Sequence, residues 1–305
     1  AAAPIPPANR ITAEIVATRT APAADPVHMP TDVAVDSRGV IYLADGTNDR
    51  IVRFRPDGTF DTPITPATVE GLHNPVGLFV DTRDRLWVAG SGARHLLVLA
   101  PDGRVETRIE LPGLDAQHPF DATDVLVTPD GQRVYIVDND NHRIVVRDPG
   151  GAFRVLGGFG RAAGQLQWPF QIALAPNGDV YITEAIGARV QRLGPRNLWA
   201  GQVGSWGVEL GQLYRPKGVV CDARGRIYVS DSTLNVVQVF NARGELLGVL
   251  TNAVGEPLRF RHPMGLAIDH QGRLLVVELA ADRVAIVRLP DGWVPTTQPT
   301  TGGAP

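Results

Sequence analysis

The sequence predicts an all-β protein with the architecture of a six-bladed β-propeller. The chain of 305 residues repeats one pattern six times: an apolar run, a turn that usually carries glycine, a second apolar run, a polar turn and a third apolar run. A small or acidic residue closes the second run of each repeat, at Asp45, Gly90, Asp138, Glu184, Asp231 and Glu278. This spacing lies in the forties, and such a period with about four short strands per unit is typical of propeller blades.

Composition supports the same fold class. The chain has 33 glycines and 25 prolines, which suit many tight turns and disfavour a helical bundle. Apolar alternation within each repeat follows the two-residue period of strands, with no helical period. Hydrophobic residues make up 44% of the chain, enough for an extended core.

The first repeat illustrates how one blade is expected to form. Its inner strand is Val33–Asp36, followed by strands at Val40–Ala44 and Arg50–Arg55, with an outer strand at Thr59–Ile64. Comparable outer strands are expected in the later repeats, at Arg104–Leu111, Ala152–Gly157, Leu198–Val203 and Glu245–Leu250.

The sixth repeat lacks an outer strand, and the chain begins with an unassigned strand-like segment, Ile11–Thr20. We predict that this N-terminal strand completes the last blade and removes the open edges of the ring. The expected organisation is a flexible segment at residues 1–10, a propeller at 11–292 with its closing strand at 11–20, and a flexible Pro/Thr/Gly tail at 293–305.

Charge and composition restrict the partners. The net charge is −3 and Lys217 is the sole lysine, so the chain lacks the concentrated basic surface that nucleic acids require. No apolar run is long enough to span a membrane. The N-terminal AAAPIPPAN is similar to a chain trimmed after a signal-peptide cleavage site, which predicts a secreted, periplasmic or cell-surface protein.

An acid and an arginine recur five residues apart around the polar turn. We expect a charge-assisted contact across each of these hairpins. The four pairs are Asp45–Arg50, Asp138–Arg143, Glu184–Arg189 and Glu278–Arg283.

The repeats fit the pattern P-x-G/D-[VIL]-A-[VIL]-D-x-x-G-x-[IVL]-Y-[VI]-x-[DE]-x-x-N-x-R-[IV] over roughly residues 30–290. This pattern resembles the NHL repeat. Pro30–Phe54 and Tyr181–Leu193 look like segments of bacterial peptidylamidoglycolate lyase-like proteins. That resemblance implies zinc held by histidines directly after the opening prolines, and a catalytic role for Arg50.

The sequence departs from that zinc motif. No histidine follows an opening proline; the residues there are Thr31, Val76, Phe170, Lys217 and Met264, and Phe120 in the longer loop of repeat three. A second set of histidines lies just before the prolines. Neutral imidazoles could bind zinc there, or they could pack under the loops between blades. These histidines are His28, His73, His118 and His262.

Repeat three has the least regular loops. Its polar turn, Asp138–His142, offers oxygen ligands that would suit calcium, and it is equally an ordinary Asp/Asn turn. Its opening loop is longer than in the other repeats, and insertions on one face of a repeat array often mark the binding face. No cofactor is expected, with zinc and calcium as the alternatives.

Aromatic and polar residues cluster near the starts of the inner strands of repeats three to five. These residues are Phe120, Asp121, Trp168, Phe170, Tyr214 and Arg215. If exposed, they form a recognition surface for a protein, peptide or glycan; alternatively they pack between blades. We therefore expect a non-catalytic binding module, with a metal-dependent lyase or hydrolase at the channel mouth as the alternative.

Overall fold

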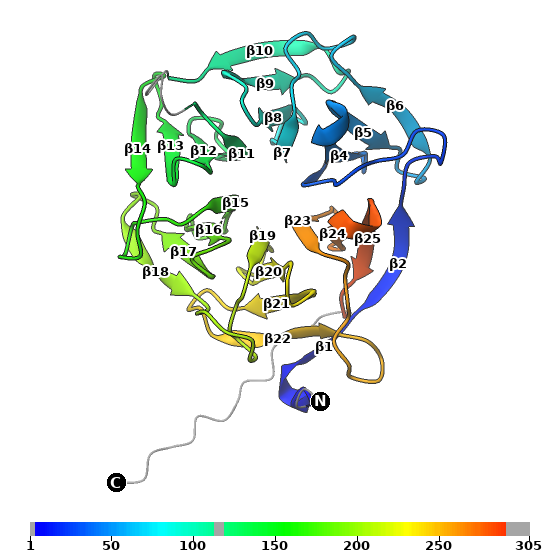
Figure 1. Cartoon of the computed structure of the whole chain (residues 1–305), viewed down its shortest axis with the longest axis vertical. Coiled ribbons are helices and arrows are strands. Elements are labelled where there is room, and N and C mark those ends of the chain that lie inside the picture. The colour runs from blue at the N-terminus through cyan, green and yellow to red at the C-terminus, as the bar shows by residue number, and fades with distance from the viewer. Residues whose placement is uncertain (1–3, 113–118, 291–305) are drawn as a thin grey trace.

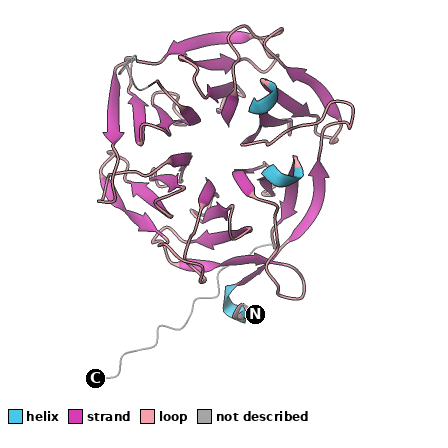
Figure 2. Ribbon diagram, in the orientation of Figure 1, coloured by secondary structure: helices cyan, strands magenta, loops and turns pink. Residues whose placement is uncertain are grey.

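The computed structural model describes residues 4–112 and 119–290 and shows six sheets arranged as blades around one axis (Figure 1). Strands account for nearly all regular structure (Figure 2). The helices of the described residues are three single 3-10 turns, η1 (Pro7–Asn9), η2 (Gly46–Asn48) and η3 (Leu279–Ala281). The predicted six-bladed all-β propeller is confirmed.

Each blade takes four consecutive strands from inside to outside, except where the N-terminus contributes. Blade one contains β3 (Val33–Val35), β4 (Ile41–Asp45), β5 (Arg50–Phe54) and β6 (Phe60–Ile64). Blade two contains β7 (Pro75–Val80), β8 (Leu86–Gly90), β9 (His95–Leu99) and β10 (Val105–Glu110). Blade three contains β11 (Ala122–Val127), β12 (Val134–Asp138), β13 (Arg143–Arg147) and β14 (Phe153–Gly157). Blade four contains β15 (Pro169–Leu174), β16 (Val180–Glu184), β17 (Arg189–Leu193) and β18 (Trp199–Val203). Blade five contains β19 (Pro216–Cys221), β20 (Ile227–Asp231), β21 (Val236–Phe240) and β22 (Leu246–Thr251). Blade six contains β23 (Pro263–Ile268), β24 (Leu274–Glu278) and β25 (Arg283–Arg288).

The second strand of every blade is buried along its whole length. A strand packed on both faces reads as a continuous apolar run, because neither set of alternating side chains meets water. The outer strands differ: β10 is almost entirely exposed. The core therefore lies between neighbouring blades; one cluster joins Tyr42 and Ile51 of blade one to Leu78 and Val88 of blade two.

The N-terminus closes the ring as predicted. Strand β2 (Glu14–Arg19) pairs antiparallel with β25, from Glu14 opposite Arg288 to Arg19 opposite Val284. An ion pair between the Glu14 and Arg288 side chains lies at the same edge. Figure 1 shows the blue first segment beside the red last blade. The joint is non-covalent.

The N-terminal segment does more than close blade six. Strand β1 (Arg10–Thr12) pairs in parallel with β22, as a fifth strand of blade five. The Ala13 amide donates to the Thr251 carbonyl at 2.8 Å, where the chain passes from one blade to the next. The expected single strand is thus two strands, because Ile11 is buried in the apolar cluster shared by blades five and six.

Residues 4–10 are also placed, in contrast to the flexible segment expected at 1–10. Ile5 is buried and packs with Val236 and Val249 of blade five. The Arg10 side chain donates to the Ile5 carbonyl at 2.8 Å. The expected tail at 293–305 lies outside the described residues. Among those described, no helix has the length and apolarity needed to cross a membrane.

The closure generates a stability prediction. Ile11→Ala should destabilise the fold by about 2–5 kcal/mol, since it opens a cavity between two blades. Val16→Ala, in the neighbouring strand at an exposed position, should cost less than about 1 kcal/mol. Chemical denaturation of both variants measures the difference.

Deletion of residues 1–20 should lower the melting temperature sharply, and a truncated chain that melts like the full one would contradict the closure.

Candidate binding face and central channel

The starts of the inner strands and the turns between second and third strands share one face of the ring, called here the loop face. The predicted acid–arginine contacts are all present on it. Their nitrogen–oxygen distances are 2.7 Å for Asp45–Arg50, 2.6 Å for Asp138–Arg143, 2.7 Å for Glu184–Arg189 and 2.5 Å for Glu278–Arg283. The four acids are fully buried.

Each of these acids also holds the loop that enters its own blade. Asp45 accepts the His28 amide at 3.1 Å, and Glu184 accepts the Gln167 amide at 2.8 Å. In blade five, where the arginine is missing, Asp231 accepts the amides of Tyr214 and Arg215 instead. The recurring acid is therefore a structural clamp for the entry loop.

Arg50, the position to which the lyase resemblance assigns catalysis, is buried in such a clamp. Its guanidinium contacts Asp45 and, at 2.5 Å, the Asp25 carboxylate. It also donates to the carbonyls of Asp25 and Pro26. All of these contacts fix the N-terminal entry loop on blade one.

The residue before the opening proline links adjacent blades. Met29, Asn74, Trp168 and His262 have left-handed backbone conformations, with φ of 51°, 38°, 52° and 50°. The amide of each donates to a side chain of the preceding blade; the acceptors are Asp282, Asp49, His142 and Asn235. A left-handed Trp is uncommon and indicates a residue held in place by its surroundings.

The histidines proposed as metal ligands are not gathered. His28, His73 and His262 are exposed, and His73 Nδ1 lies 3.5 Å from an Asp49 oxygen. His118 lies outside the described residues. Among those described, no group of three or more His, Cys, Asp or Glu side chains is placed to hold a metal ion.

The turn considered for calcium uses its side chains within the protein. Asp138 accepts from Arg143 and from the Asp121 amide. The Asn139 and Asn141 side chains donate to the carbonyls of Pro169 and Pro119. These contacts fit the interpretation of the segment as a turn.

Three polar side chains at the starts of inner strands form hydrogen bonds between neighbouring blades near the axis. Asp32 of blade one, Asp124 of blade three and Gln171 of blade four are all buried. Each accepts an amide from the next blade: Leu78 donates to Asp32 at 2.9 Å, Ile172 to Asp124 at 2.8 Å and Val219 to Gln171 at 2.7 Å.

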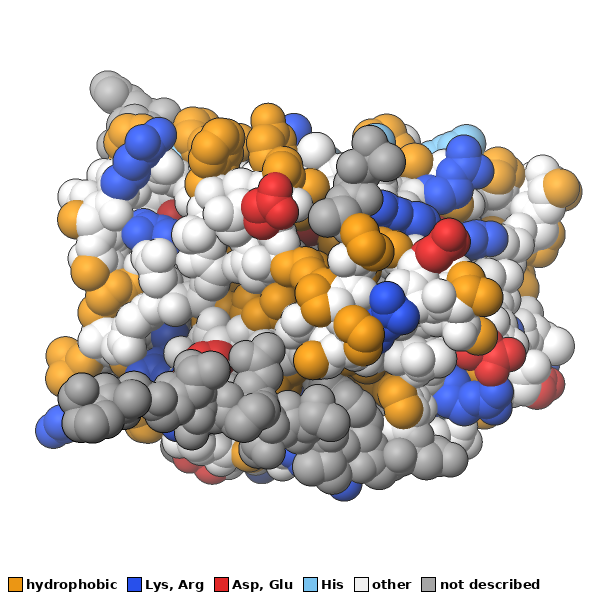
Figure 3. Space-filling model, turned by 90° about the horizontal axis from the view of Figure 1, so that it is seen from below, with side chains coloured by type: hydrophobic (Ala, Val, Ile, Leu, Met, Phe, Trp, Pro, Cys, Tyr) orange, Lys and Arg blue, Asp and Glu red, His pale blue; other side chains and the backbone are white. Residues whose placement is uncertain are grey.

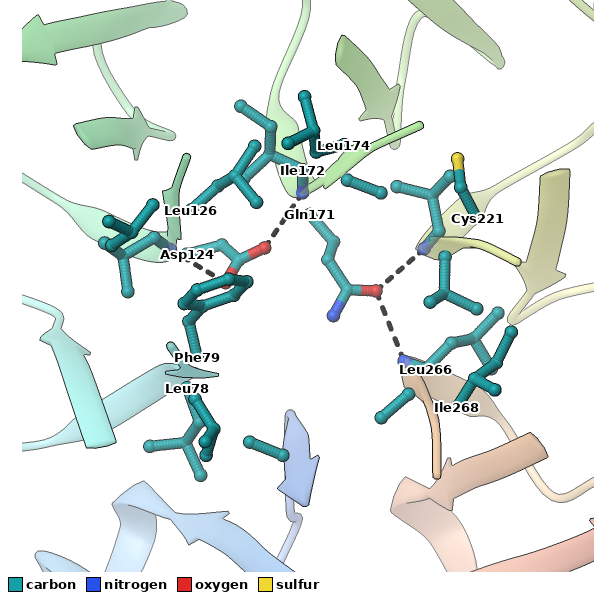
Figure 4. Close-up of a pocket in the computed structure, with 18 of the residues that line it drawn as sticks. Leu78, Phe79, Asp124, Leu126, Gln171, Ile172, Leu174, Cys221, Leu266 and Ile268 are labelled. Atoms are coloured by element: carbon teal, nitrogen blue, oxygen red, sulfur yellow. Dashed lines mark hydrogen bonds between the residues drawn. The ribbon is translucent and has the colours of Figure 1, made fainter. Parts of the chain in front are cut away.

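Gln171 also reaches across the axis (Figure 4). Its oxygen accepts the Leu266 amide of blade six at 3.2 Å, and its nitrogen donates to Asp32 at 2.7 Å. The remaining blades carry glycine at this position, and a Cβ on Gly265 would lie 2.1 Å from an Asp32 oxygen. A cavity of about 330 Å³, lined by all six inner strands, adjoins Asp124 and Gln171.

Burial changes the protonation of the two acids. Burial raises the pKa of Asp32 to about 7, although three hydrogen bonds oppose it. Burial and the nearby Asp32 charge raise the pKa of Asp124 well above its ordinary value. Sequence analysis did not single out these residues, because this position of the repeat differs between blades, with Asp, Gln or Gly.

The predicted binding-face residues divide into two groups. Phe120 and Phe170 are half-buried, and Asp121 accepts a hydrogen bond from Ser91 of blade two at 2.5 Å. Trp168 and Tyr214 are exposed by 37% and 42%, and Arg215 is also exposed. The first group packs within the ring, whereas the second is available to a ligand.

The exposed group belongs to a larger apolar surface above blades three to five, which we call the apolar patch. It consists of Phe159, Trp168, Ile186, Trp206, Val208, Leu210 and Tyr214. Phe159 and Trp206 are 61% and 70% exposed, and their ring centroids lie 6.1 Å from Trp168 and 6.2 Å from Tyr214, respectively. Hydrophobic side chains are visible along the upper rim of the molecule in the side view of Figure 3.

The two aromatic pairs come from equivalent loops. Residues 159–166 and 206–213 share the sequence [FW]-G-x-x-x-G-Q-L, and in both loops the glutamine oxygen accepts a backbone amide of the same loop. Gly207 has a φ of 155°, which residues with a side chain rarely adopt, and a Cβ there would lie 1.9 Å from the Gln212 oxygen and displace it from the turn. This repeated motif is the signal that could have identified Phe159 and Trp206 from the sequence.

A pocket of about 520 Å³ borders the patch. Its lining consists of Arg161, Gln167, Ile186, Gly187, Arg189, Gln202, Ser205 and Trp206. Arg189 is held by Glu184 and by the carbonyls of Arg161 and Gln165. Arg161 is exposed and its side chain forms no ion pair with another described residue. The pocket thus combines an indole, amides and an available positive charge.

No protein-family model matches the chain, and no curated protein matches it. Solved structures do resemble it. A gluconolactonase from Xanthomonas campestris is 18% identical with a TM-score of 0.67, covering 94% of this chain and 99% of that one. A streptogramin B lyase is 12% identical with a TM-score of 0.63, covering 92% and 98%. A virginiamycin B lyase from Staphylococcus aureus, solved with quinupristin, is 13% identical with a TM-score of 0.62, covering 92% and 88%. The chain shares the six-bladed propeller fold with these proteins.

The clamp makes a mutational prediction. Arg143→Ala should destabilise the protein by roughly 1–3 kcal/mol, because it leaves the buried Asp138 carboxylate without its charged partner. His95→Ala should cost less, since His95 occupies the same position in blade two with one hydrogen bond to the Gly71 carbonyl. Urea unfolding compares the two. If His95→Ala were the more damaging change, the clamp interpretation would be wrong.

The buried acids make a pH prediction. Since the folded-state pKa of Asp32 is raised to about 7 from 3.8, the folded protein binds more protons than the unfolded chain between these values. This contribution to stability is complete below pH 3.8 and is lost as the pH rises to 7. The loss per pH unit is at most about 1.4 kcal/mol. Asp32→Asn should flatten this slope in unfolding experiments between pH 5 and pH 8, and an unchanged slope would contradict the assignment.

Proposed function

We propose that the protein is an exported binding module that recognises a polypeptide partner through the apolar patch. The observation that carries the proposal is the concentration of seven exposed hydrophobic side chains on one sector of the loop face. A concentration of exposed apolar side chains of this kind costs free energy in water and commonly marks an interaction site. Trp and Tyr are also the side chains most often found to dominate binding energy at interfaces.

The chemistry of the patch favours a polypeptide over a glycan. Ile186, Val208 and Leu210 extend it beyond the aromatic rings, and aliphatic side chains match those of a partner protein better than a hydroxylated sugar. Arg161, at the pocket, suits a carboxylate of the partner. The expected ligand is therefore a segment with apolar side chains and an acidic group.

A metal-dependent lyase or hydrolase at the channel mouth is the alternative. The lyases and the gluconolactonase of the same fold are compatible with this alternative, although a shared fold does not establish a shared reaction. His28, His73 and His262 do not fit a zinc site, because no three potential ligands are grouped among the residues that the structure describes. We therefore derive no metal-dependent step.

A phage-displayed random dodecapeptide library tests the proposal. We expect enrichment of peptides with aromatic or aliphatic residues and at least one acid. Trp206→Ala should weaken a selected peptide by roughly thirtyfold, equivalent to about 2 kcal/mol, as measured by calorimetry. Leu198→Ala is the matched control, since Leu198 is 60% exposed and lies outside the patch, in the turn between β17 and β18.

Three outcomes would contradict the proposal. The first is a library that yields no enriched sequence. The second is a selected peptide that binds Trp206→Ala and the parent protein equally. The third is specific binding on a glycan array that is lost in Trp206→Ala, which would assign the patch to a carbohydrate.

A further inference from the structure

His142 contacts two aromatic members of the apolar patch. It is half-buried at the end of the polar turn of blade three. Its ring centroid lies 4.4 Å from that of Trp168 and 4.9 Å from that of Phe159. The His142 carbonyl also accepts the amide of Gly158 at 2.9 Å, directly before Phe159. One residue therefore positions both the loop that carries Phe159 and the loop that carries Trp168.

A hydrogen bond defines the protonation state of the His142 ring. The Trp168 amide donates to the Nδ1 atom of His142 at 3.1 Å. A backbone N–H can only donate, so Nδ1 must present an electron pair and the ring is the neutral form with its proton on Nε2. A second proton would occupy Nδ1 and face the N–H group of Trp168. Two donors cannot form a hydrogen bond, so this contact would be lost.

The equivalent contact in other blades uses acceptors that gain no charge near neutral pH. Asp49, Asn235 and Asp282 occupy the position of His142 in blades one, five and six, and each accepts the amide that corresponds to that of Trp168. The four acceptor residues share a left-handed backbone, with φ between 50° and 60°, so their side chains start from equivalent positions: φ is 51°, 60°, 51° and, for His142, 55°. Carboxylate and amide oxygens stay acceptors over the range in which an imidazole titrates. Among these four blades, the contact in blade three is the one that can respond to pH.

The surroundings of the ring favour its neutral form. The two aromatic rings against it are uncharged, and burial lowers the pKa of His142 from its ordinary value of 6.5. The carboxylates of Asp140 and Asp138, on the same turn, oppose this effect, and Asp138 is itself paired with Arg143. Among the described residues, these two acids are the charged groups that act on the ring. A free ring gains its proton near pH 6.5 and the bonded ring at a lower pH, so the contact is complete above pH 6.5 and weakens as the pH falls below it.

We propose that His142 is a pH-dependent positioning residue for the apolar patch: protonation of its ring detaches Trp168 and weakens binding of the polypeptide partner in mildly acidic solution. This inference rests on the proposed function, because it describes the regulation of that same surface. The left-handed backbone of Trp168 is uncommon, so loss of the hydrogen bond removes part of what holds it. Trp168 then moves relative to Phe159, whose ring centroid lies 6.1 Å away, and the aromatic surface offered to the partner changes.

Nuclear magnetic resonance tests the switch without a partner. In isotope-labelled protein titrated from pH 7.5 to pH 5.0, the imidazole resonances of His142 report protonation and the amide resonance of Trp168 reports the hydrogen bond. We expect both to shift with one midpoint below pH 6.5. In His142→Asn the Trp168 amide should not shift over this range. Asn235 shows that an asparagine at this position can accept the amide, at 3.0 Å in blade five.

Calorimetry with a peptide selected on the apolar patch tests the regulation. The affinity of the parent protein should fall roughly fivefold between pH 7.5 and pH 5.5, because proton uptake competes with binding. His142→Asn should keep its affinity over this range within about twofold, since its acceptor does not titrate. Asp32 also titrates near pH 7, but this acid is retained in His142→Asn and cannot produce the difference. His73→Gln is the matched control: this exposed histidine of the loop face lies outside the patch, and its replacement should leave the fall in affinity intact.

The switch and the proposed function fail separately. A library without binders contradicts the proposed function alone. A Trp168 amide that does not shift while His142 gains its proton would overturn the switch. Equal affinity of the parent protein at pH 7.5 and pH 5.5 would overturn the regulation, and so would an equal loss of affinity in the parent protein and in His142→Asn.

Discussion

The ring depends on contacts that pass from one blade to the next at the start of the inner strands. A single blade cannot bury its own apolar faces, so the fold exists only when the blades pack face to face around the axis. Asp32, Asp124 and Gln171 provide this link near the axis, by accepting backbone amides of the following blade. Their burial is tolerated because their oxygens are hydrogen-bonded, and protonation relieves the remaining cost of charge.

A rigid centre allows the loop face to vary. Two sets of hydrogen bonds hold each entry loop: one to the buried acid of its own blade and one to a side chain of the preceding blade. Loop residues that make neither contact are free to differ between blades. In blades three to five those residues are aromatic and aliphatic, and they form the apolar patch. The left-handed backbone of Trp168 and the edge-to-face contact of its ring with His142, at a centroid distance of 4.4 Å, show how firmly one member of the patch is positioned.

Much of this arrangement could be predicted from the sequence, because the repeat encodes it six times. The blade number and the Asp45–Arg50 type of contact follow from spacing, and the closing strand follows from the outer strand that the sixth repeat lacks. Whether Phe120 and Phe170 are buried or exposed could not be predicted, because aromatic rings at one repeat position pack inward or outward according to their neighbours in other blades. The separate pairing of Arg10–Thr12 with β22 was not predicted, because blade five has four strands of its own and its repeat shows no missing strand.

Native-state hydrogen exchange of three amides tests the central claim most directly. The account predicts that the amides of Leu78, Ile172 and Val219 exchange only through global unfolding, with protection equal to the free energy of unfolding measured by denaturant. These amides donate to the three side chains that join the blades at the axis. Exchange as fast as that of the exposed outer strand β10 would contradict the account, since it would show that the blades separate at the axis without unfolding.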